Sequence, residues 1–568
     1  LASAGDKPAK MHHLPQELSP EALLPVDKAL ASGDAVEQAY KALWGRYRKV
    51  WTETAARCLK NPAGFEEAVL SLSERFLWAV PSSTMDQPDV SLHDHSRAVA
   101  AFAAALFRYH QAAGSLGDAK ALTDRTRPAF RFLVGDLSGI QSTLFRFKNE
   151  QVSGLNKTLR GRSLRFQLMT DAAARRMLTA FGMPMSAMLQ AAGGRFLLVV
   201  PALADADDRL QKLREDFDGW FVRQYSGDLA MGLSLSAPFA ADDLIEAEGG
   251  EGADAPRKRA EAVRGNLSVA IETTKLYLLA EQAAAGVVKV SFENGACASC
   301  GLRPADDKGL CHACAAERKL GERLPSSRTV IVRDGGHRGD DILGQDYILP
   351  LGDGEYASGP ETGWRWMPQG TEDRGPAPLR AGPGWVARFG EDLSHYGGIE
   401  EAEAGHIKTF EALARDGRER DANGKPLGRE MLALLKGDVD HLGQIFAGGL
   451  GKRWSVARNA ALSRMMDAYF SLRLPWLLET EFPESYTVYA GGDDFMLVLP
   501  WRQGFELARC LQEDFAAFAG QNPSLTFSLG VALFDPRTPI SIAAHEAEER
   551  LAAAKDAGRN RVCAIEPG

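Results

Sequence analysis

The feature that most constrains this chain is an internal repeat. RFLVGDLSGI at 131–140 and ALLKGDVDHL at 433–442 each lead from apolar residues through Gly-Asp into a loop. Farther along, GGRFLLVVP at 193–201 corresponds to GGDDFMLVLP at 491–500, and a Gly-Gly pair between two strand-like runs is typical of a β-hairpin. The surrounding pattern predicts the order β-α-β-β-α-β in both copies, which is the ferredoxin-like arrangement.

Composition places the chain among ordinary globular proteins. Its 568 residues are 45% hydrophobic and 25% charged, and the net charge is −9. A length of about 150 residues per domain predicts three or four domains. The acidic balance argues against a generic DNA-coating protein. No apolar run is long enough to span a membrane and no signal pattern is evident, so we expect a cytoplasmic protein.

We therefore expect an α+β fold with two ferredoxin-like palm domains of the cyclase and polymerase type, a zinc-binding insert and an N-terminal helical domain. The predicted boundaries, in chain order, are a helical region at 1–125, a degenerate first palm at 126–245, a linker with a zinc module at 246–328, connecting strands and loops at 329–425, and a catalytic second palm at 426–568.

Two pairs of carboxylates mark the second copy. Asp438 and Asp440 follow its first strand, and Asp493 and Asp494 lie in its hairpin turn. First strand and hairpin are sheet neighbours, so the pairs should lie side by side and need a cation, for which hard oxygen ligands select Mg²⁺ or Mn²⁺. Two such ions about 3.5–4 Å apart suit phosphoryl transfer. The alternative is that Asp-Asp after Gly-Gly is only a turn sequence.

The first copy departs from this pattern. It keeps Asp136, but Ser138 stands where Asp440 stands, and we expect Arg195 and Phe196 to replace the Asp-Asp pair. By these residues it cannot hold two metal ions. It can still bind a nucleotide, or serve only to pack against the second copy.

Other residues of the second copy fit nucleotide binding. Gly491 and Gly492 allow a tight turn and the close approach of a nucleotide. The loop that reaches Gly443 opens a helix, and helix N-termini attract anions. Lys555, at the end of the last helix, either reaches a triphosphate or only complements the helix dipole.

Four cysteines form a separate cluster. Cys297-Ala-Ser-Cys300 and Cys311-His-Ala-Cys314 are two knuckles separated by ten residues. Four thiolates at this spacing predict a tetrahedral Zn²⁺ site without an open position, so its role is structural.

These motifs resemble a known family. GDVDHLGQIF at 437–446, YAGGDDFMLVLP at 489–500 and AKDAGRNRV at 554–562 are similar to nucleotide-cyclase palm domains. Taken with DLSGIQ at 136–141 and LRGRS at 159–163, the chain resembles the large subunit of the type III-A CRISPR effector, the Csm complex, which has two palm domains with a zinc module between them.

The resemblance implies an enzyme that makes cyclic oligoadenylate from ATP. Its activity would be switched on by target RNA bound to the guide CRISPR RNA, in a complex with other Csm subunits. Asp438 and Asp494 would be the principal ligands of two Mg²⁺ or Mn²⁺ ions, with Asp493 and Asp440 beside them, and Lys555 would touch the triphosphate. A second ATP would lie at the palm–palm interface. Its neighbours would be Ser138, Gly139, Gly193 and Gly194.

The histidines near the N-terminus bear on a second activity. This family usually begins with a nuclease domain of the HD type, and His93-Asp94-His95 resembles only the closing part of one. The upstream His-Asp pair is missing, so we expect the region 1–125 to be a remnant without nuclease activity. The alternative role of these residues is helix capping and hydrogen bonding.

Two groups of basic residues are candidates for contact with guide RNA or a partner subunit, or else are solvated charged faces. They are Lys157, Arg160, Arg162 and Arg165, and Arg257, Lys258, Arg259 and Arg264. Three alternative functions stay open: a non-catalytic scaffold subunit of the same complex, a dinucleotide cyclase with GGDEF-like chemistry, and a DNA nuclease.

Overall fold

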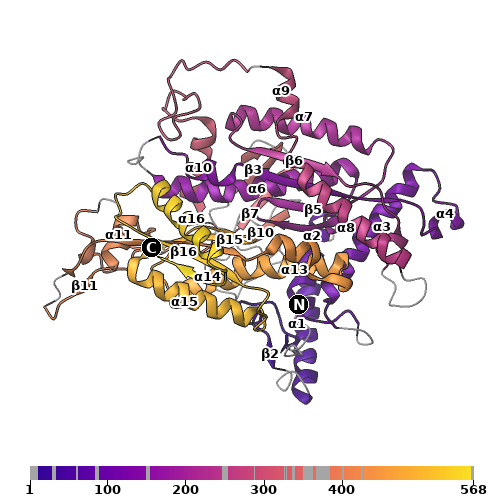
Figure 1. Cartoon of the computed structure of the whole chain (residues 1–568), viewed down its shortest axis with the longest axis horizontal. Coiled ribbons are helices and arrows are strands. Elements are labelled where there is room, and N and C mark those ends of the chain that lie inside the picture. The colour runs from indigo at the N-terminus through magenta and orange to yellow at the C-terminus, as the bar shows by residue number, and fades with distance from the viewer. Residues whose placement is uncertain are drawn as a thin grey trace.

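The computed structural model shows two α+β units that lie against each other, with the first palm in purple and magenta above the orange and yellow second palm in Figure 1. The structure describes residues 11–27, 33–58, 62–83, 88–148, 154–245, 254–286, 288–324, 327, 329–334, 339–348, 362–365, 384–399, 402–423 and 426–564.

The first palm has the predicted order of elements. Its sheet runs β4-β5-β3-β6, which is the ferredoxin-like order. The strands are β3 (Phe130–Ser138), β4 (Met188–Ala192), β5 (Arg195–Pro201) and β6 (Ala230–Leu235). The helices are α5 (Ile140–Leu144), α6 (Leu155–Phe181) and α7 (Ala206–Tyr225).

The second palm repeats this topology and adds a parallel edge strand, giving the order β14-β15-β13-β16-β17. The strands are β13 (Leu432–Val439), β14 (Tyr486–Gly491), β15 (Asp494–Pro500), β16 (Phe527–Phe534) and β17 (Val562–Cys563). The helices are α12 (Leu442–Gln444), α13 (Val456–Ala468), α14 (Leu474–Glu481), α15 (Trp501–Phe518) and α16 (Ile540–Asp556).

The central strand β13 is covered on both faces. Leu432 and Leu434 belong to one hydrophobic cluster, whereas Ala433 and Leu435 belong to the other, and all four are fully buried. Such a strand reads as a continuous apolar run instead of an alternating one. The run ends in Gly-Asp, so the first polar side chains emerge where the strand leaves the core.

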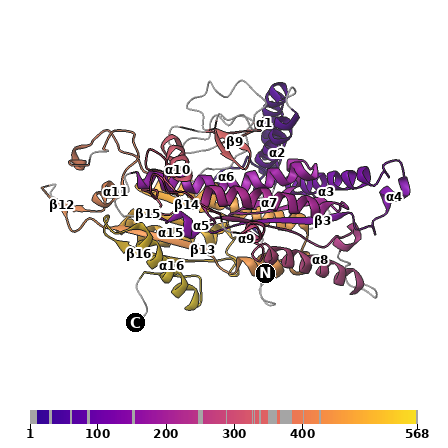
Figure 2. The same ribbon diagram turned by 90° about the horizontal axis from the view of Figure 1, so that it is seen from above.

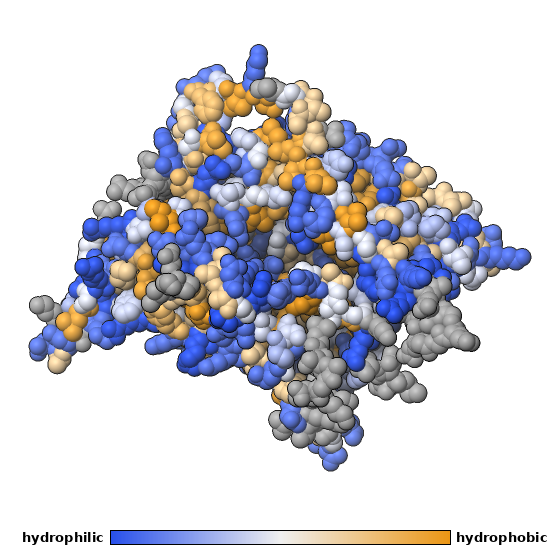
Figure 3. All heavy atoms as spheres, viewed as in Figure 1, coloured by the Kyte–Doolittle hydropathy of each residue, from blue (hydrophilic) through white to orange (hydrophobic). Residues whose placement is uncertain are grey.

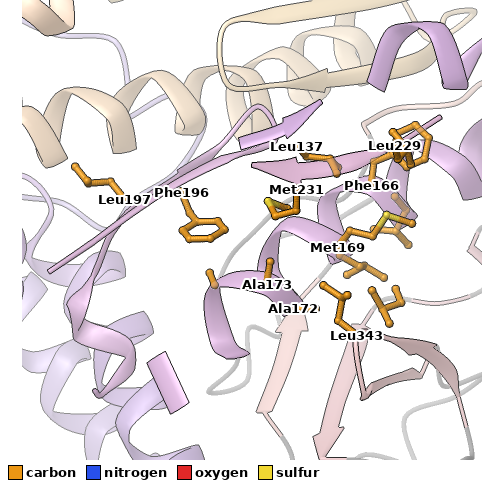
Figure 4. Close-up of a cluster of buried hydrophobic side chains, with 14 of the residues drawn as sticks. Leu137, Phe166, Met169, Ala172, Ala173, Phe196, Leu197, Leu229, Met231 and Leu343 are labelled. Atoms are coloured by element: carbon orange, nitrogen blue, oxygen red, sulfur yellow. The ribbon is translucent and has the colours of Figure 1, made fainter. Parts of the chain in front are cut away.

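Helix α6 is the central helix of the first palm. In Figure 4, Ala173 of α6 lies between Phe196 of β5 and the loop residue Leu343, and Phe166 of α6 lies beside Leu229. Leu343 lies in a turn of a second, four-stranded sheet. Its strands, in the order β10-β7-β9-β8, are β7 (Thr329–Asp334), β8 (Asp340–Ile342), β9 (Gln345–Ile348) and β10 (Thr362–Arg365).

Burial of α6 overturns one expectation from the sequence. Arg160, Arg162 and Arg165 are at most 4% exposed, so they do not form an RNA-contacting surface. Arg162 is paired with Glu317, Arg165 with Asp340, and Arg160 donates to Gly321 and the Tyr486 hydroxyl. Sequence spacing alone could not distinguish these internal cations from a solvated cluster. Arg257, Lys258 and Arg259 of the second group are exposed.

The N-terminal region is helical, as predicted, and its helices project from the palms in Figure 2. They are α1 (Asp34–Cys58), α2 (Pro62–Leu77), α3 (Leu92–Ala112) and α4 (Ala119–Thr123). The segment before them pairs β1 (Met11–His12) with β2 (Val26–Asp27), and its Leu18 and Leu23 are buried in the hydrophobic cluster of the second palm.

The remaining elements lie between the palms in sequence. They are α8 (Asp254–Thr273), α9 (Ala280–Ala285), α10 (His312–Arg323), α11 (Phe410–Asp416), β11 (Glu419–Arg420) and β12 (Pro426–Leu427). Most of the predicted linker at 246–256 lies outside the described residues. In the ranges given above, no helix combines the length and hydropathy needed to cross a membrane.

Candidate active site

The two carboxylate-bearing segments meet at one end of the second sheet. Asp438, near the end of β13, is the cross-strand partner of Asp494, the first residue of β15. Side chains in this relation have Cβ atoms about 4.5–5.5 Å apart. The turn between β14 and β15 is held against β13, because Val439 N donates to the main-chain oxygen of Asp493 at 3.0 Å.

Burial and mutual repulsion make these carboxylates unusual. Burial, followed by the charge of Asp493, raises the pKa of Asp494 to about 7. Burial and the charge of Asp438 also raise the pKa of Asp493. The Tyr489 hydroxyl donates to Asp494 Oδ2 at 3.1 Å. Asp493 and Asp494 are thus desolvated beside the like charge of Asp438, an arrangement that a cation would stabilise.

Two lysines flank the carboxylates. Lys555 Nζ, from the end of α16, lies 2.5 Å from Asp438 Oδ1. Lys436 lies two residues before Asp438 on the same face of β13, is 4% exposed and pairs with Glu548. Burial lowers the pKa of Lys436, while the nearby Asp494 and Asp438 oppose that shift. Sequence reasoning missed Lys436, because a lysine in an apolar run carries no motif.

Asp440 is engaged differently from the other three carboxylates. It is 2% exposed, and its oxygens accept from Ser528 Oγ at 2.8 Å, Thr526 Oγ1 at 2.9 Å and the main-chain nitrogen of Asn560 at 3.0 Å. These contacts join the loop after β13 to β16 and to the segment that follows α16. In this structure the carboxylate of Asp440 therefore holds loops together.

A cavity of about 450 Å³ opens beside these loops. Arg559 and Asn560 contribute to its wall from the segment after α16, and His441 and Gln444 contribute from the start of α12. Arg559 and Asn560 belong to the AKDAGRNRV motif at 554–562, in which only Lys555 was predicted as a site residue. Arg559 lies beyond α16, which ends at Asp556, and has a φ of 60°, so helical spacing from Lys555 could not have pointed to it. Gly443 is exposed, and a Cβ atom added to it would have no other atom within 4 Å.

The register corrects the predicted comparison of the two hairpins. Arg195 is the first residue of β5 and the cross-strand partner of Asp136, to which it is ion-paired at 3.3 Å. Both hairpins have two-residue turns, so Arg195 corresponds to Asp494 and Gly194 to Asp493. Phe196 corresponds to Phe495 and does not replace an aspartate. The two hairpins have the same length, and the Gly-Gly pair lies one position later in the first, where Gly193 and Gly194 form the turn that Gly492 and Asp493 form in the second.

The two hairpin turns touch each other across the palms. A Cβ atom on Gly492 would lie 2.7 Å from Gly193 Cα, and one on Gly193 would lie 3.4 Å from Asp493 Oδ1. Only glycine permits this approach, because both residues also have positive φ. A cavity of about 70 Å³ next to the turns is lined in part by Gly194 and Gly491. Ser138 and Gly139 lie at the end of β3 and the start of α5.

The four cysteines form a buried cluster. Cys297, Cys300, Cys311 and Cys314 place their Sγ atoms within 4.8 Å of one another, and they are the only group of three or more potential metal ligands of this kind among the described residues. The Cys300 and Cys311 sulfurs are 3.9 Å apart, as tetrahedral zinc coordination requires. Cys311 caps α10, since its Sγ accepts from the Cys314 amide. This donor set fits Zn²⁺.

The zinc module is fixed to the first palm where α10 crosses α6. A Cβ atom on Gly161 would lie 1.7 Å from the Glu317 carbonyl oxygen, and one on Gly321 would lie 1.8 Å from that of Lys157. Beside this crossing Arg162 pairs with Glu317 at 2.8 Å, and both side chains are fully buried. The Arg162 guanidinium also lies 3.7 Å from Cys314 Sγ.

The histidine motif is built into the interface between α3 and the second palm. His93 Nδ1 is 2.7 Å from Ser73 Oγ, and Asp94 forms a bidentate pair with Arg464 of α13 at 2.9 and 2.8 Å. Burial by itself raises the Asp94 pKa, but the charge and hydrogen bonds of Arg464, together with His93 and Ser91, outweigh it and lower the pKa to about 2. Ser91 caps α3 and bonds to Asp94.

Comparison with known proteins matches both palms. The family model described as Cas10/Cmr2, second palm domain, matches residues 431–563. The family model described as Csm1 subunit domain B matches residues 129–285.

Relatives extend the match over most of the chain. A protein of Thermococcus onnurineus (strain NA1), named CRISPR system single-strand-specific deoxyribonuclease Cas10/Csm1 (subtype III-A), is 27% identical over 555 residues. The match covers 91% of this chain and 64% of that protein, so the chain spans less than two thirds of the relative's length.

Solved structures agree with this match. The structure of a Csm1–Csm4 cassette in complex with one ATP has a TM-score of 0.71 and 25% identity, and covers 98% of this chain and 71% of that one. A Csm1–Csm4 cassette in complex with pppApA has a TM-score of 0.69 and 25% identity, covering 98% and 70%.

Two ferredoxin-like sheets that meet through their hairpin turns, with a four-cysteine module docked on the first, define a double-palm protein. The matches above indicate which double-palm proteins the chain resembles. The palms match the models of Csm1 subunit domain B and of the Cas10/Cmr2 second palm domain, and 91% of the chain is similar to a Cas10/Csm1 protein of subtype III-A, which confirms the resemblance drawn from the sequence.

Proposed function

We propose that this chain makes cyclic oligoadenylate from ATP, as the large subunit of an RNA-guided type III-A effector. The observation that carries the proposal is the Asp438–Asp494 pair, two carboxylates directly opposite each other on adjacent strands at one end of the second sheet, of which burial raises the pKa of Asp494 to about 7. The structural relatives in complex with ATP and with pppApA, a linear adenylate, support the same substrate class.

The donor set fits a hard divalent cation. Asp438, Asp493 and Asp494 offer only oxygen ligands. The pKa of Asp494 is raised by burial and by the neighbouring negative charge of Asp493, which a bound cation would offset. Asp440 is taken up by three hydrogen bonds, so we assign it to orienting the loops. Bound Mg²⁺ or Mn²⁺ would neutralise phosphate charge and lower the pKa of the attacking hydroxyl.

The phosphates of the donor ATP would be held by cations after α16. Lys555 is bound to Asp438 and would exchange that carboxylate for a phosphate. Arg559 lines the neighbouring cavity of about 450 Å³, which has room for a triphosphate group. Both residues would stabilise the charge that builds up on the departing pyrophosphate.

In the reaction, the 3′-hydroxyl of one adenylate attacks the α-phosphorus of an ATP. A new P–O bond forms, the bond from the α-phosphorus to the bridging oxygen breaks, pyrophosphate leaves, and the hydroxyl proton passes to solvent. No protein nucleophile is needed, because positioning and electrostatic stabilisation carry phosphoryl transfer. The attacking nucleotide would lie on the first palm, near Ser138, Gly139, Gly193 and Gly194.

We further propose that the four cysteines hold a structural Zn²⁺ and that the chain assembles with a Csm4-type subunit, as the structural relatives do. Exposed apolar side chains around α9 offer a surface for a partner, and Figure 3 shows orange atoms gathered at the top, where Figure 1 places α9. Those side chains are Leu276, Tyr277, Val288, Val290 and Phe292.

We propose no nuclease activity at the histidine motif. The Asp94 carboxylate is neutralised by Arg464, His93 Nδ1 lies against Ser73, and among the described residues this motif does not bring three potential metal ligands together.

Mass analysis of products from ATP or GTP with Mn²⁺ or Mg²⁺ tests the function, first on the isolated chain and then on the complex loaded with guide and target RNA. We expect oligoadenylate from the parent and none from the Asp438→Asn/Asp494→Asn variant. A cyclic dinucleotide from GTP would instead identify GGDEF-like chemistry. No product in the loaded complex would identify a scaffold.

A further inference from the structure

The two palms carry opposite charges at one equivalent position. Arg195 begins β5 and is the cross-strand partner of Asp136, just as Asp494 begins β15 and is the partner of Asp438. The sheets share their strand order and their two-residue hairpin turns. A guanidinium therefore occupies in the first palm the position at which the second palm presents a carboxylate.

The side chain of Arg195 has donors to spare. It is 44% exposed, and its pairing with Asp136 uses Nη2 at 3.3 Å, longer than the 2.7–2.9 Å typical of a charge-assisted hydrogen bond. In the part of the chain that the structure describes, Nε and Nη1 have no protein acceptor. A guanidinium presents its donors as a rigid fork that matches phosphate oxygens.

Arg195 also lies beside the carboxylates of the other palm. Its own turn is the one that touches Gly492, and Gly193 lies against the Asp493 carboxylate. The positive charge of Arg195 counteracts the raised pKa that burial gives Asp493. Phosphates on the first palm would thus lie near the reacting centre.

From this arrangement we infer that Arg195 replaces the metal ion in the first palm: it binds, without a divalent cation, a phosphate group of the nucleotide that supplies the attacking hydroxyl. The inference rests on the proposed function and deepens it. The first palm has no carboxylate pair to hold a cation, yet a nucleotide there brings several negative charges that must be neutralised. Arg195 is placed to do this, and Asp136 is the acceptor that it would release.

Calorimetric titration of the full chain with a non-hydrolysable ATP analogue tests this inference. In buffer freed of divalent ions by a chelating resin, we expect the parent to retain one binding event. Arg195→Ala should weaken that event by about tenfold or more, the loss expected for a hydrogen bond to a charged group, and Arg195→Lys should recover part of it. Asp494→Asn should leave it in place and remove the additional binding that Mg²⁺ produces.

Two controls separate phosphate binding from damage to the fold. Arg209→Ala removes an arginine of the same palm that pairs with Asp205 on α7, and should bind the analogue as the parent does. Adenosine, which lacks phosphates, should bind the parent and Arg195→Ala equally.

Metal-free binding that is absent from the parent, or unchanged in Arg195→Ala, would overturn the inference, as would an equal loss of adenosine binding. None of these results touches the proposed function, which fails only if the RNA-loaded complex makes no oligoadenylate.

Discussion

Asp438 lies directly opposite Asp494 across β13 and β15, and Lys555 contacts only the first of the two. Asp494 therefore remains a buried carboxylate among like charges, with its pKa raised to about 7. Asp440, two residues away from Asp438, is by contrast saturated with hydrogen-bond donors. The charge of Asp440 therefore stabilises the fold, whereas that of Asp494 does not.

The first prediction separates these roles. In protein free of divalent ions, Asp494→Asn should keep or raise the thermal unfolding midpoint, because it removes a repelled charge. Asp440→Asn should lower stability by about 1–3 kcal/mol, because buried donors lose a charged acceptor. Thermal unfolding followed by circular dichroism measures both. Equal losses in the two variants would contradict the distinction.

The second prediction concerns the crossing of α6 and α10. Gly161→Ala should strongly destabilise the protein and loosen the zinc module, because its Cβ would collide with the Glu317 carbonyl oxygen at 1.7 Å. Gly265→Ala, in α8 with open space around it, should be neutral or stabilising by up to ~1 kcal/mol. Hydrogen exchange of the α10 amides is the measurement, and the prediction fails if these amides are equally protected in both variants.

The third prediction concerns the join between α3 and the second palm. Arg464→Met should cost about 3–5 kcal/mol, because it leaves Asp94 buried without its counter-charge. Arg458→Met breaks the more exposed pair with Asp89 at the same join and should cost about 1 kcal/mol or less. The double variant Asp94→Asn/Arg464→Met should recover stability relative to Arg464→Met. Unfolding by urea compares the three, and a smaller loss in Arg464→Met than in Arg458→Met would contradict the assignment.

The fourth prediction concerns zinc. Cys300→Ser should abolish binding of about one equivalent of zinc and lower the unfolding midpoint, because a structural zinc site contributes folding free energy. Cys510→Ser, outside the cluster, should retain the metal. Elemental analysis of the purified variants decides the point. Zinc retained by Cys300→Ser would argue against a four-thiolate site.

The fifth prediction is a pH dependence at His93. Burial lowers its pKa to about 3, whereas in the unfolded chain the ordinary histidine pKa of 6.5 applies. Below pH 6.5 the unfolded state therefore binds a proton that the folded state does not, so stability falls as the pH drops from 6.5 toward 3. His93→Gln should reduce this fall, measured as the midpoint at pH 7.5 minus that at pH 5. His545→Gln, at an exposed position, should leave the difference unchanged.

Much of the fold could be predicted from the sequence because it is encoded locally. The apolar runs that end in Gly-Asp, the Gly-Gly hairpins and the helical periods between them are each readable within about ten residues. Their repetition led to two ferredoxin-like sheets, which the structure confirms. The cysteine knuckles are equally local, and their sulfurs do gather.

Other properties depend on contacts between distant segments. No local pattern shows that Arg162 and Arg165 lie inside α6, because their partners Glu317 and Asp340 are more than 150 residues away. The correspondence of Arg195 with Asp494 likewise needed the strand register, since the Gly-Gly pairs that invite the sequence comparison occupy positions that differ by one residue in the two hairpins.

The sequence by itself determined the repeated sheets, the hairpin carboxylates and the zinc knuckles, because strand period, turn chemistry and ligand spacing are short-range properties. Only the tertiary structure decided which charges are buried as partners and which face a ligand. Burial and electrostatic environment depend on the whole chain around a residue, so Asp440 and Asp494 differ although each belongs to an equally plain motif.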